Sequence, residues 1–255
     1  MKAILVVSFG TSHRDTREKT IDKIEQDIAE AYKDYKVYRA FTSKMIISIM
    51  KKKYNEVVLP VKSAMEQMIS DGVKEVVVQP THVLNGIEND IMKAEILEYT
   101  DKFSKISIGD PLLTTHEDSC QLIEAILSEF AFVKSDTAVV LMGHGTTHYA
   151  NSIYPALDYQ FKQMGHKNFF VSTVEGYPEI DVVLNYVKAE NFTKVVLAPL
   201  MIVAGDHAKN DLAGDEPDSY KSIFLDNGFE VECHLKGLGE YEGIRQLLIK
   251  HIIME

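Results

Sequence analysis

The chain has 255 residues, enough for one large domain or two small ones that each bury a core. Hydrophobic residues make up 45% and charged residues 25%, which is typical of a globular protein rather than a disordered or fibrous one. The formal net charge of −11 leaves no basic surplus to neutralise phosphates, so nucleic acids and anionic membranes are not expected as partners.

The first apolar run, "AILVV", is too short for the hydrophobic region of a signal peptide and far too short to span a bilayer. We therefore expect a cytoplasmic protein whose chain begins with a buried strand. Cys120 and Cys233 match no CxxC pattern, and thiols in a reducing compartment are expected rather than a disulfide.

Short β-branched runs alternate with amphipathic stretches along the chain. Continuous apolar runs of this kind are typical of strands buried on both faces. Between them, apolar residues recur at helical spacing, for example over 21–31 and 61–69. The alternation predicts mostly parallel α/β sheets with right-handed crossovers. The expected strands are 3–9, 36–41, 74–79, 105–109, 138–143, 169–174, 194–199 and 230–235.

The eight expected strands divide four and four, and the two sets resemble each other. The segment "VVSFGTSH" at 6–13 matches "VLMGHGTTH" at 140–148. Further along, "KEVVVQPTHVLNG" at 74–86 matches "TKVVLAPLMIVAG" at 193–205. Two matches in the same order indicate an internal duplication.

The duplication predicts two similar α/β halves, 1–134 and 135–255, with the boundary near "FVKSD" at 132–136. We expect each half to be a four-stranded, mostly parallel sheet flanked by helices, and the halves to face each other across a cleft. The apolar pattern at 243–254 predicts a C-terminal helix. That helix could pack on its own core or on a partner subunit, which leaves a homo-oligomer open.

Three polar residues follow successive strands of the second half. His144 stands between two glycines after the first of these strands, and Glu175 and His207 follow at intervals of 31 and 32 residues. Each interval is about one βαβ unit, so all three should emerge at the carboxyl edge of one parallel sheet. Imidazole and carboxylate groups suit divalent ions such as cobalt, nickel, iron or zinc, and three ligands leave positions open for a substrate.

Each of the three also has an ordinary structural explanation. A lone histidine after a strand is commonly a hydrogen-bonded structural group, Glu175 could cap a helix beginning near Pro178, and His207 could lie in an exposed loop. Their shared register favours the metal site. The histidines without such support are expected to be structural or solvent-facing: His13, His116, His148, His166, His234 and His251.

In the first half, "PTHVLNGIENDIM" at 80–92 aligns with the segment that contains His207, and Glu88 aligns with His207 itself. A carboxylate there would face the metal across the cleft and accept a proton. Glu88 could equally belong to an acidic helix start, which the helix macrodipole favours.

The segments "GTS" at 10–12 and "GTT" at 145–147 each follow a strand and open a helix. Backbone N–H groups and hydroxyls there favour a bound anion, although Ser and Thr are also routine helix caps. The chain has no Gly-x-x-x-x-Gly-Lys-Ser/Thr, Gly-x-Gly-x-x-Gly or Gly-x-Ser-x-Gly motif, so the usual signs of nucleotide binding or a serine hydrolase are absent.

These motifs resemble the class II chelatases, specifically the anaerobic sirohydrochlorin cobaltochelatases of cobalamin biosynthesis (CbiK-type). The resemblance runs essentially end to end and rests on "VVSFGTS", "PTHVLNGIEND", "MGHGT", "VEGYP" and "PLMIVAGDHAKNDLAGDEPDS". It implies two α/β halves around a tetrapyrrole cleft, and an enzyme of the lyase class that inserts Co²⁺ into sirohydrochlorin. No cofactor is implied beyond the substrate metal, for which Fe²⁺ and Ni²⁺ are alternatives.

By motif, the resemblance implies that His144, Glu175 and His207 hold the metal and that Glu88 stands on the opposite wall. A neutral imidazole can act as a metal ligand and as a proton acceptor, so His144 and Glu88 are the expected catalytic residues. The glycines beside His144 are expected to admit the flat macrocycle. The residues predicted to bind it are Phe9, Gly10, Thr11, Asn85, Gly86 and Glu88.

Sirohydrochlorin carries eight carboxylates, so a chain with a net charge of −11 repels it electrostatically. Local donors must bind them, and Arg14, Lys93 and Lys209 are candidates. Tyr220 stands where many relatives have tryptophan, and the chain contains no Trp, so the loop expected there should pack, or close on substrate, differently.

Other functions stay open from the sequence. A ferrochelatase or nickel chelatase on a related tetrapyrrole would use the same ligand types. A non-catalytic tetrapyrrole or metal carrier would share the cleft but would not need the proton acceptor Glu88. A metal-dependent hydrolase would place a water in the open metal position, but the long "GDHAKNDLAGDEPD" match disfavours it.

Overall fold

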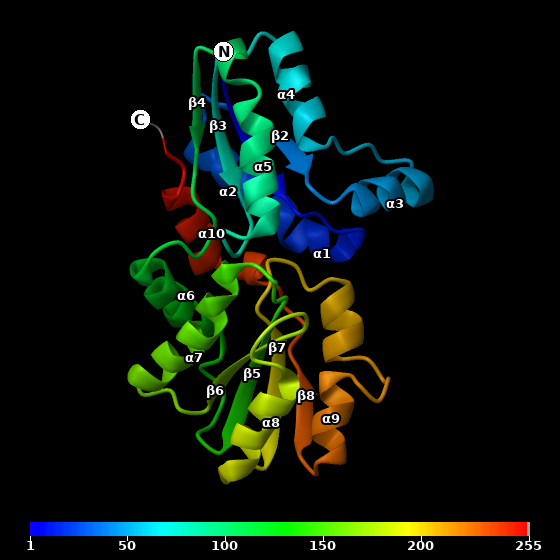
Figure 1. Ribbon diagram of the computed structural model, residues 1–255, viewed down its shortest axis with the longest axis vertical. Coiled ribbons are helices and arrows are strands. Elements are labelled where there is room, and N and C mark those ends of the chain that lie inside the picture. The colour runs from blue at the N-terminus through cyan, green and yellow to red at the C-terminus, as the bar shows by residue number, and fades with distance from the viewer. Residues whose placement is uncertain (254–255) are drawn as a thin grey trace. The chain divides into compact units, whose positions relative to one another are not determined.

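The computed structural model describes residues 1–253, which form two four-stranded parallel sheets (Figure 1). The strand orders are β2-β1-β3-β4 and β6-β5-β7-β8, so the second sheet repeats the topology of the first. The prediction of two similar halves, each built on a parallel four-stranded sheet with flanking helices, is confirmed. The strands are β1 Lys2–Ser8, β2 Lys36–Phe41, β3 Glu75–Pro80, β4 Lys105–Ile108, β5 Thr137–Gly143, β6 Phe169–Thr173, β7 Lys194–Pro199 and β8 Glu230–Cys233.

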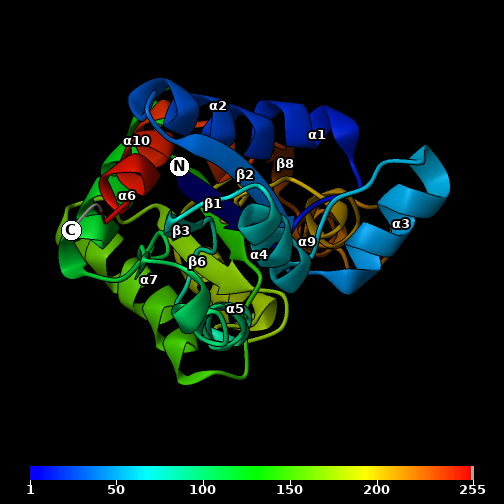
Figure 2. The same ribbon diagram turned by 90° about the horizontal axis from the view of Figure 1, so that it is seen from above.

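Helices cover both faces of the first sheet. Figure 2 shows α2 and α10 on one side of its strands and α4 and α5 on the other. Residues of β1 alternate between the faces, and Ala3, Leu5 and Val7 join the buried cluster beneath α4 and α5. The helices of this region are α1 Arg14–Lys19, α2 Ile21–Ala31, α3 Lys44–Tyr54, α4 Val61–Ser70, α5 Ile87–Leu97, η1 Thr100–Lys102 and α10 Glu242–Lys250.

The amphipathic stretches predicted over 21–31 and 61–69 are the helices α2 and α4. Apolar residues in the body of each helix are buried, whereas Ala31 and Ile69 are exposed near the C-terminal ends. The helical period therefore identifies the buried face of each helix correctly. It does not show at which residue that face stops being covered by the sheet.

The second sheet has the same layered construction. Ala138, Val140 and Met142 of β5 pack against apolar side chains of α8 and α9, while α7 packs on β6. Among residues 1–253, no helix is both long enough and apolar enough to cross a membrane. The helices of this region are α6 His116–Glu129, η2 Tyr149–Ser152, α7 Ile153–Gln163, α8 Ile180–Ala189, the π-helix η3 Ala208–Leu212, α9 Tyr220–Asp226 and η4 Leu238–Glu240.

The chain forms two compact units whose limits differ from the predicted halves 1–134 and 135–255. One unit is Met1–Asp118 together with the segment that begins at Glu242, and the other is Ser119–Tyr241. The first turn of α6 thus belongs to the first unit, and the chain returns to that unit with α10. The predicted C-terminal helix over 243–254 ends at Lys250, and its last predicted residue lies outside the described residues.

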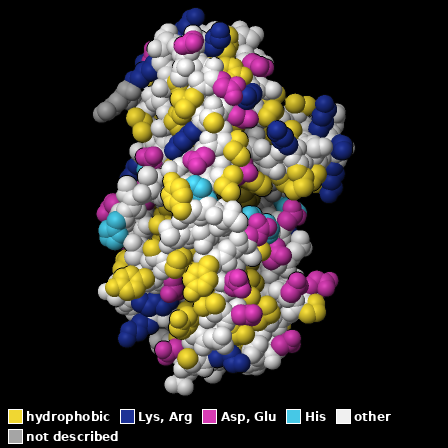
Figure 3. Space-filling view, viewed as in Figure 1, with side chains coloured by type: hydrophobic (Ala, Val, Ile, Leu, Met, Phe, Trp, Pro, Cys, Tyr) yellow, Lys and Arg dark blue, Asp and Glu magenta, His cyan; other side chains and the backbone are white. Residues whose placement is uncertain are grey.

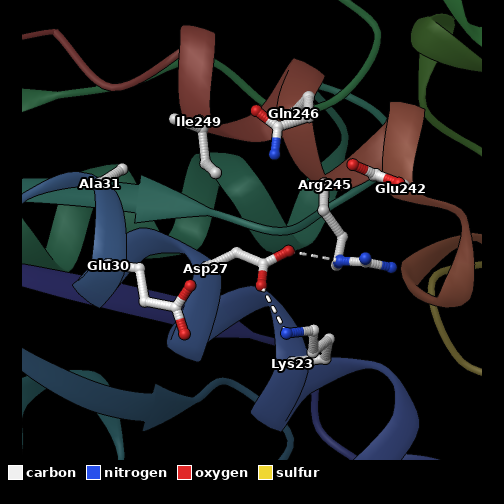
Figure 4. A pocket seen from close by; sticks show the side chains of 8 residues that line it. All are labelled: Lys23, Asp27, Glu30, Ala31, Glu242, Arg245, Gln246 and Ile249. Carbon is white, nitrogen blue, oxygen red and sulfur yellow. Dashed lines mark hydrogen bonds and ion pairs between the residues drawn. The ribbon is translucent and has the colours of Figure 1, made fainter.

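Ionic contacts join α10 to α2 around a polar hollow between the two helices (Figure 4). Asp27 Oδ2 lies 2.6 Å from Arg245 Nε, and Asp27 Oδ1 lies 2.8 Å from Lys23 Nζ. Burial alone would raise the pKa of Asp27, but these hydrogen bonds outweigh it and hold the pKa below its ordinary value. The sequence allowed the C-terminal helix to pack on the chain's own core or on a partner subunit. In the structure α10 packs on the chain's own helix α2.

Candidate metal centre

His144, Glu175 and His207 lie together at the carboxyl edge of the second sheet. They follow β5, β6 and β7, which are neighbours in the sheet order β6-β5-β7-β8. One potential ligand atom from each residue lies within 4.8 Å of those of the other two. The sequence separations of about one βαβ unit therefore do translate into a shared location, while the role of the three as metal ligands stays a prediction.

The three side chains are accessible. Their exposed fractions are 45% for His144, 62% for Glu175 and 35% for His207. The two imidazole rings meet edge to face, with centroids 4.7 Å apart and an interplanar angle of 88°. Glu175 Oε2 lies 4.0 Å from His144 Nδ1, and the backbone N–H of Glu175 donates to the His144 carbonyl at 2.7 Å. Backbone pairing thus continues beyond the strands and holds His144 beside Glu175.

The ring nitrogens of both histidines have distinct partners. His144 Nδ1 lies 2.9 Å from the Gly145 carbonyl, and His207 Nδ1 lies 2.7 Å from Asp211 Oδ2. A carbonyl and an ionised carboxylate can only accept, so each Nδ1 must carry the proton in these contacts. In a neutral ring this leaves the lone pair on Nε2, which is the form of histidine that binds a metal.

Asp211 is a residue of this site that the sequence analysis missed. It is four residues after His207, and the helical turn that includes η3 brings the two side chains together. The i, i+4 spacing of an acid after a candidate ligand histidine was the available signal. It required knowing that the segment after His207 is helical rather than an exposed loop.

Replacing Asp211 by alanine is expected to weaken Co²⁺ binding by about 10- to 100-fold, because His207 loses the partner that sets its tautomer and ring orientation. Isothermal titration of Co²⁺ without tetrapyrrole would measure the loss. Asp215→Ala is the matched control, since Asp215 pairs with Lys221 and is 97% exposed. Equal affinities in the two variants would contradict the role given to Asp211.

The glycines beside His144 are required by the protein's own packing, and the expectation that they admit the macrocycle stays a prediction. A Cβ on Gly143 would lie 2.2 Å from the buried Tyr154 ring, and one on Gly145 would lie 2.5 Å from the backbone nitrogen of Gly176. Gly145 also has a φ of +84°, a region that glycine adopts readily. Gly143 therefore makes room for the Tyr154 ring of α7, and Gly145 allows the loops after β5 and β6 to approach each other closely.

Gly145→Ala tests this close approach. Gly165→Ala is the matched control, because Gly165 has a φ of +90° but open space around its Cα. The control should lose about 1–2 kcal/mol of unfolding free energy through backbone strain alone. Gly145→Ala should lose about 1–3 kcal/mol more through overpacking and should also weaken Co²⁺ binding. Denaturant unfolding and Co²⁺ titration of both variants would show whether only Gly145→Ala carries the second defect.

Two further side chains brace the loops of the centre. Asn151 accepts from Thr146 N at 3.0 Å and donates to the Tyr177 carbonyl at 2.7 Å. Tyr220 is buried and donates to the Thr173 carbonyl at 2.9 Å, and burial raises the pKa of its hydroxyl. The expectation of a loop at Tyr220 was wrong, because Tyr220 is the first residue of α9 and its ring fills the core.

Phe9, Gly10 and Thr11 form the turn after β1. Phe9 is 45% exposed, and Gly10 has a φ of +100° with the Phe41 ring against its Cα. Thr11 is buried, and its hydroxyl accepts from His13 N at 3.1 Å. The equivalent turn after β5 has the same contact at 3.1 Å, from His148 N to the Thr146 hydroxyl. The two turns are therefore structural copies, as the sequence duplication predicts.

Asn85, Gly86 and Glu88 lie where β3 leads into α5. Gly86 is the residue before the first turn of α5, and Glu88 is half-buried within that turn. Asn85 Oδ1 accepts from Lys93 Nζ at 3.1 Å. The acidic helix start that the sequence offered as an alternative for Glu88 is thus present, and its role as a proton acceptor stays a prediction.

His82, in the same connection, was also missed by the sequence analysis. Burial lowers the pKa of His82 to about 4, and the Asn89 side chain opposes that shift. A buried histidine of this kind is neutral at neutral pH. Its burial suits support of the connection between β3 and α5 better than direct contact with a ligand.

The family model for cobalt chelatase (CbiK) matches residues 2–254. The chain belongs to this family. It is 38% identical over 253 residues to the sirohydrochlorin cobaltochelatase of Salmonella typhimurium, covering 98% of this chain and 95% of the relative. It is 31% identical over 257 residues to the sirohydrochlorin cobaltochelatase CbiKC of Nitratidesulfovibrio vulgaris, covering 98% and 89%. The predicted family and enzyme class are confirmed.

A solved structure of the sirohydrochlorin chelatase SirB from Bacillus subtilis subspecies spizizenii, in complex with cobalt, has the same fold as this cobalt chelatase. The TM-score is 0.67 at 13% identity, and the match covers 98% of this chain and 93% of the other. At this identity the likeness bears on the fold alone.

Proposed function

We propose that this cobalt chelatase inserts Co²⁺ into sirohydrochlorin, with His144, Glu175 and His207 holding the metal. The observation that carries the proposal is the meeting of two imidazoles and a carboxylate at the carboxyl edge of the second sheet. It is supported by membership of the cobalt chelatase family and by relatives named sirohydrochlorin cobaltochelatase. Three ligands leave coordination positions of Co²⁺ open to incoming pyrrole nitrogens.

Insertion replaces two pyrrole N–H protons by one divalent cation, so two protons must leave the macrocycle for each metal that enters. His144 accepts one after it releases the metal through Nε2, and Glu88 accepts the other. The proposed metal ligands belong to the second unit. The residues proposed to bind the macrocycle belong to the first unit: Phe9, Gly10, Thr11, Asn85, Gly86 and Glu88. We place the reaction in the cytoplasm as part of the same proposal, because the cysteine pattern fits a reducing compartment.

The test is an anaerobic assay in which purified protein, sirohydrochlorin and Co²⁺ are mixed and the visible spectrum is followed. Rapid conversion with many turnovers per protein supports the proposal. A bound spectrum without metallation would identify a carrier, and no spectral change would exclude a tetrapyrrole substrate. Parallel assays with Fe²⁺ and Ni²⁺ decide the metal, since imidazole and carboxylate accept all three ions.

A further inference from the structure

Helix α3 is a local concentration of positive charge. Helix α3, with the sequence "KMIISIMKKKY", contains four lysines and no acidic residue, although the whole chain has a net charge of −11. All four lysines are exposed, and none lies within ion-pair distance of an acidic group among residues 1–253. They are Lys44, Lys51, Lys52 and Lys53.

Two of the side chains proposed from the sequence to bind the substrate carboxylates already interact with other residues. Arg14 Nη2 lies 3.4 Å from Glu56 Oε2, and Lys93 Nζ donates to Asn85 Oδ1 at 3.1 Å. A neutralised or hydrogen-bonded cation attracts a distant anion more weakly than an unpaired one. The lysines of α3 are therefore better suited than Arg14 to attract a polyanion.

The start of α3 adjoins the turn predicted to bind substrate, and its end lies beside Arg14, the first residue of α1. At its start, the N–H of Ser43 donates to the Phe9 carbonyl at 3.2 Å. At its end, the Tyr54 ring packs on Arg14, with the guanidinium carbon 4.4 Å from the ring centroid. Between these anchors α3 projects beyond the edge strand β2 (Figures 1 and 2), and Figure 3 shows Lys and Arg side chains gathered over its outer part.

We propose that α3 is a capture helix for the substrate, in which Lys51, Lys52 and Lys53 attract the carboxylates of the tetrapyrrole and guide it to the turn at Phe9. This inference rests on the proposed function, which supplies a polycarboxylate as the occupant. Clustered charges beside a binding site raise association rates by roughly 10- to 1000-fold, and the effect falls steeply with ionic strength. The helix thereby provides local attraction on a chain whose overall charge repels its substrate.

The same lysines have a second physical effect. They occupy the last turn of α3, where cations interact favourably with the helix macrodipole. If that were their whole role, neutralising them would lower the melting temperature slightly and would leave substrate association unchanged. The association rate of the substrate therefore distinguishes the two roles.

The experiment compares two triple variants that each remove three positive charges. K51Q/K52Q/K53Q alters α3, whereas K74Q/K102Q/K105Q alters three exposed lysines at the amino end of the same sheet. The association rate of sirohydrochlorin is measured by stopped flow without metal, at low and at high ionic strength. We expect the α3 variant to bind about five- to tenfold more slowly at low salt and within about twofold of wild type at high salt. The control should stay within about twofold throughout.

Equal slowing of association in both variants would show that only the net charge of the protein matters and would overturn the proposal. A slower association that is the same at low and at high salt would overturn it too. No slowing in the α3 variant would overturn it as well. Because the readout needs no metal, it is independent of catalysis. A wild type that binds the tetrapyrrole but never metallates it would refute the proposed function and leave the capture role to be judged on rates alone.

Discussion

His144→Ala is expected to lower kcat/KM for cobalt insertion by about 10³- to 10⁴-fold, the largest effect of any single substitution considered. On the proposed function the variant loses a metal ligand and a proton acceptor together, and acid–base assistance alone contributes about 10²- to 10⁴-fold. The edge-to-face contact with the His207 ring is lost too, so the remaining ligands hold the metal less firmly.

Anaerobic initial rates with saturating sirohydrochlorin and subsaturating Co²⁺ would measure this loss. His148→Ala is the matched control, because His148 follows the same strand but its Nδ1 accepts from Ala150 N within its own turn. The control should keep the wild-type rate within about threefold. Near-normal insertion by His144→Ala would show that the metal enters by another route, and the proposed ligand set would have to be abandoned.

Glu88→Gln is expected to lower kcat by about 10²-fold while leaving Co²⁺ affinity unchanged, because an amide of the same shape cannot accept a proton. The competing explanation is that Glu88 only stabilises the start of α5 through the macrodipole. In that case the substitution would cost about 0.3–1 kcal/mol of stability and no rate. The two explanations therefore predict changes in different measurements.

Asp90→Asn provides the comparison, since Asp90 is exposed in the same first turn of α5. Both variants should lose similar, small amounts of unfolding free energy in denaturant titrations. Only Glu88→Gln should lose turnover in the steady-state anaerobic assay. Matching kcat values for the two variants would show that Glu88 only stabilises the first turn of α5.

Much of the fold was predictable because its signals are local. The apolar runs of the eight strands lie within one or two residues of the observed strands, since a strand buried on both faces needs a continuous apolar run. The spacing of His144, Glu175 and His207 anticipated a shared sheet edge, because parallel βαβ units repeat at nearly constant length. These inferences needed only the spacing of apolar residues and of repeated βαβ units along the sequence.

The contacts that the sequence missed or left open share a different cause. The glycines beside His144 meet Tyr154 and Gly176, Tyr220 fills the core beneath β6, and α10 returns to pack on α2. Each of these contacts joins residues from separate elements, and no periodicity reports them. Asp211 was missed because its nearness to His207 depends on the helical turn that both share.

The amino-acid sequence by itself determined the class of fold, the duplication and the shared sheet edge of His144, Glu175 and His207, because all three follow from composition and repeat spacing. The tertiary structure decided which groups brace those residues: the carboxylate of Asp211 on His207, the Gly145 carbonyl on His144, and the anchors that hold α3 beside Phe9. Hydrogen-bond partners and the location of unpaired charge depend on distances across the folded chain, and those distances exist only once packing has set them.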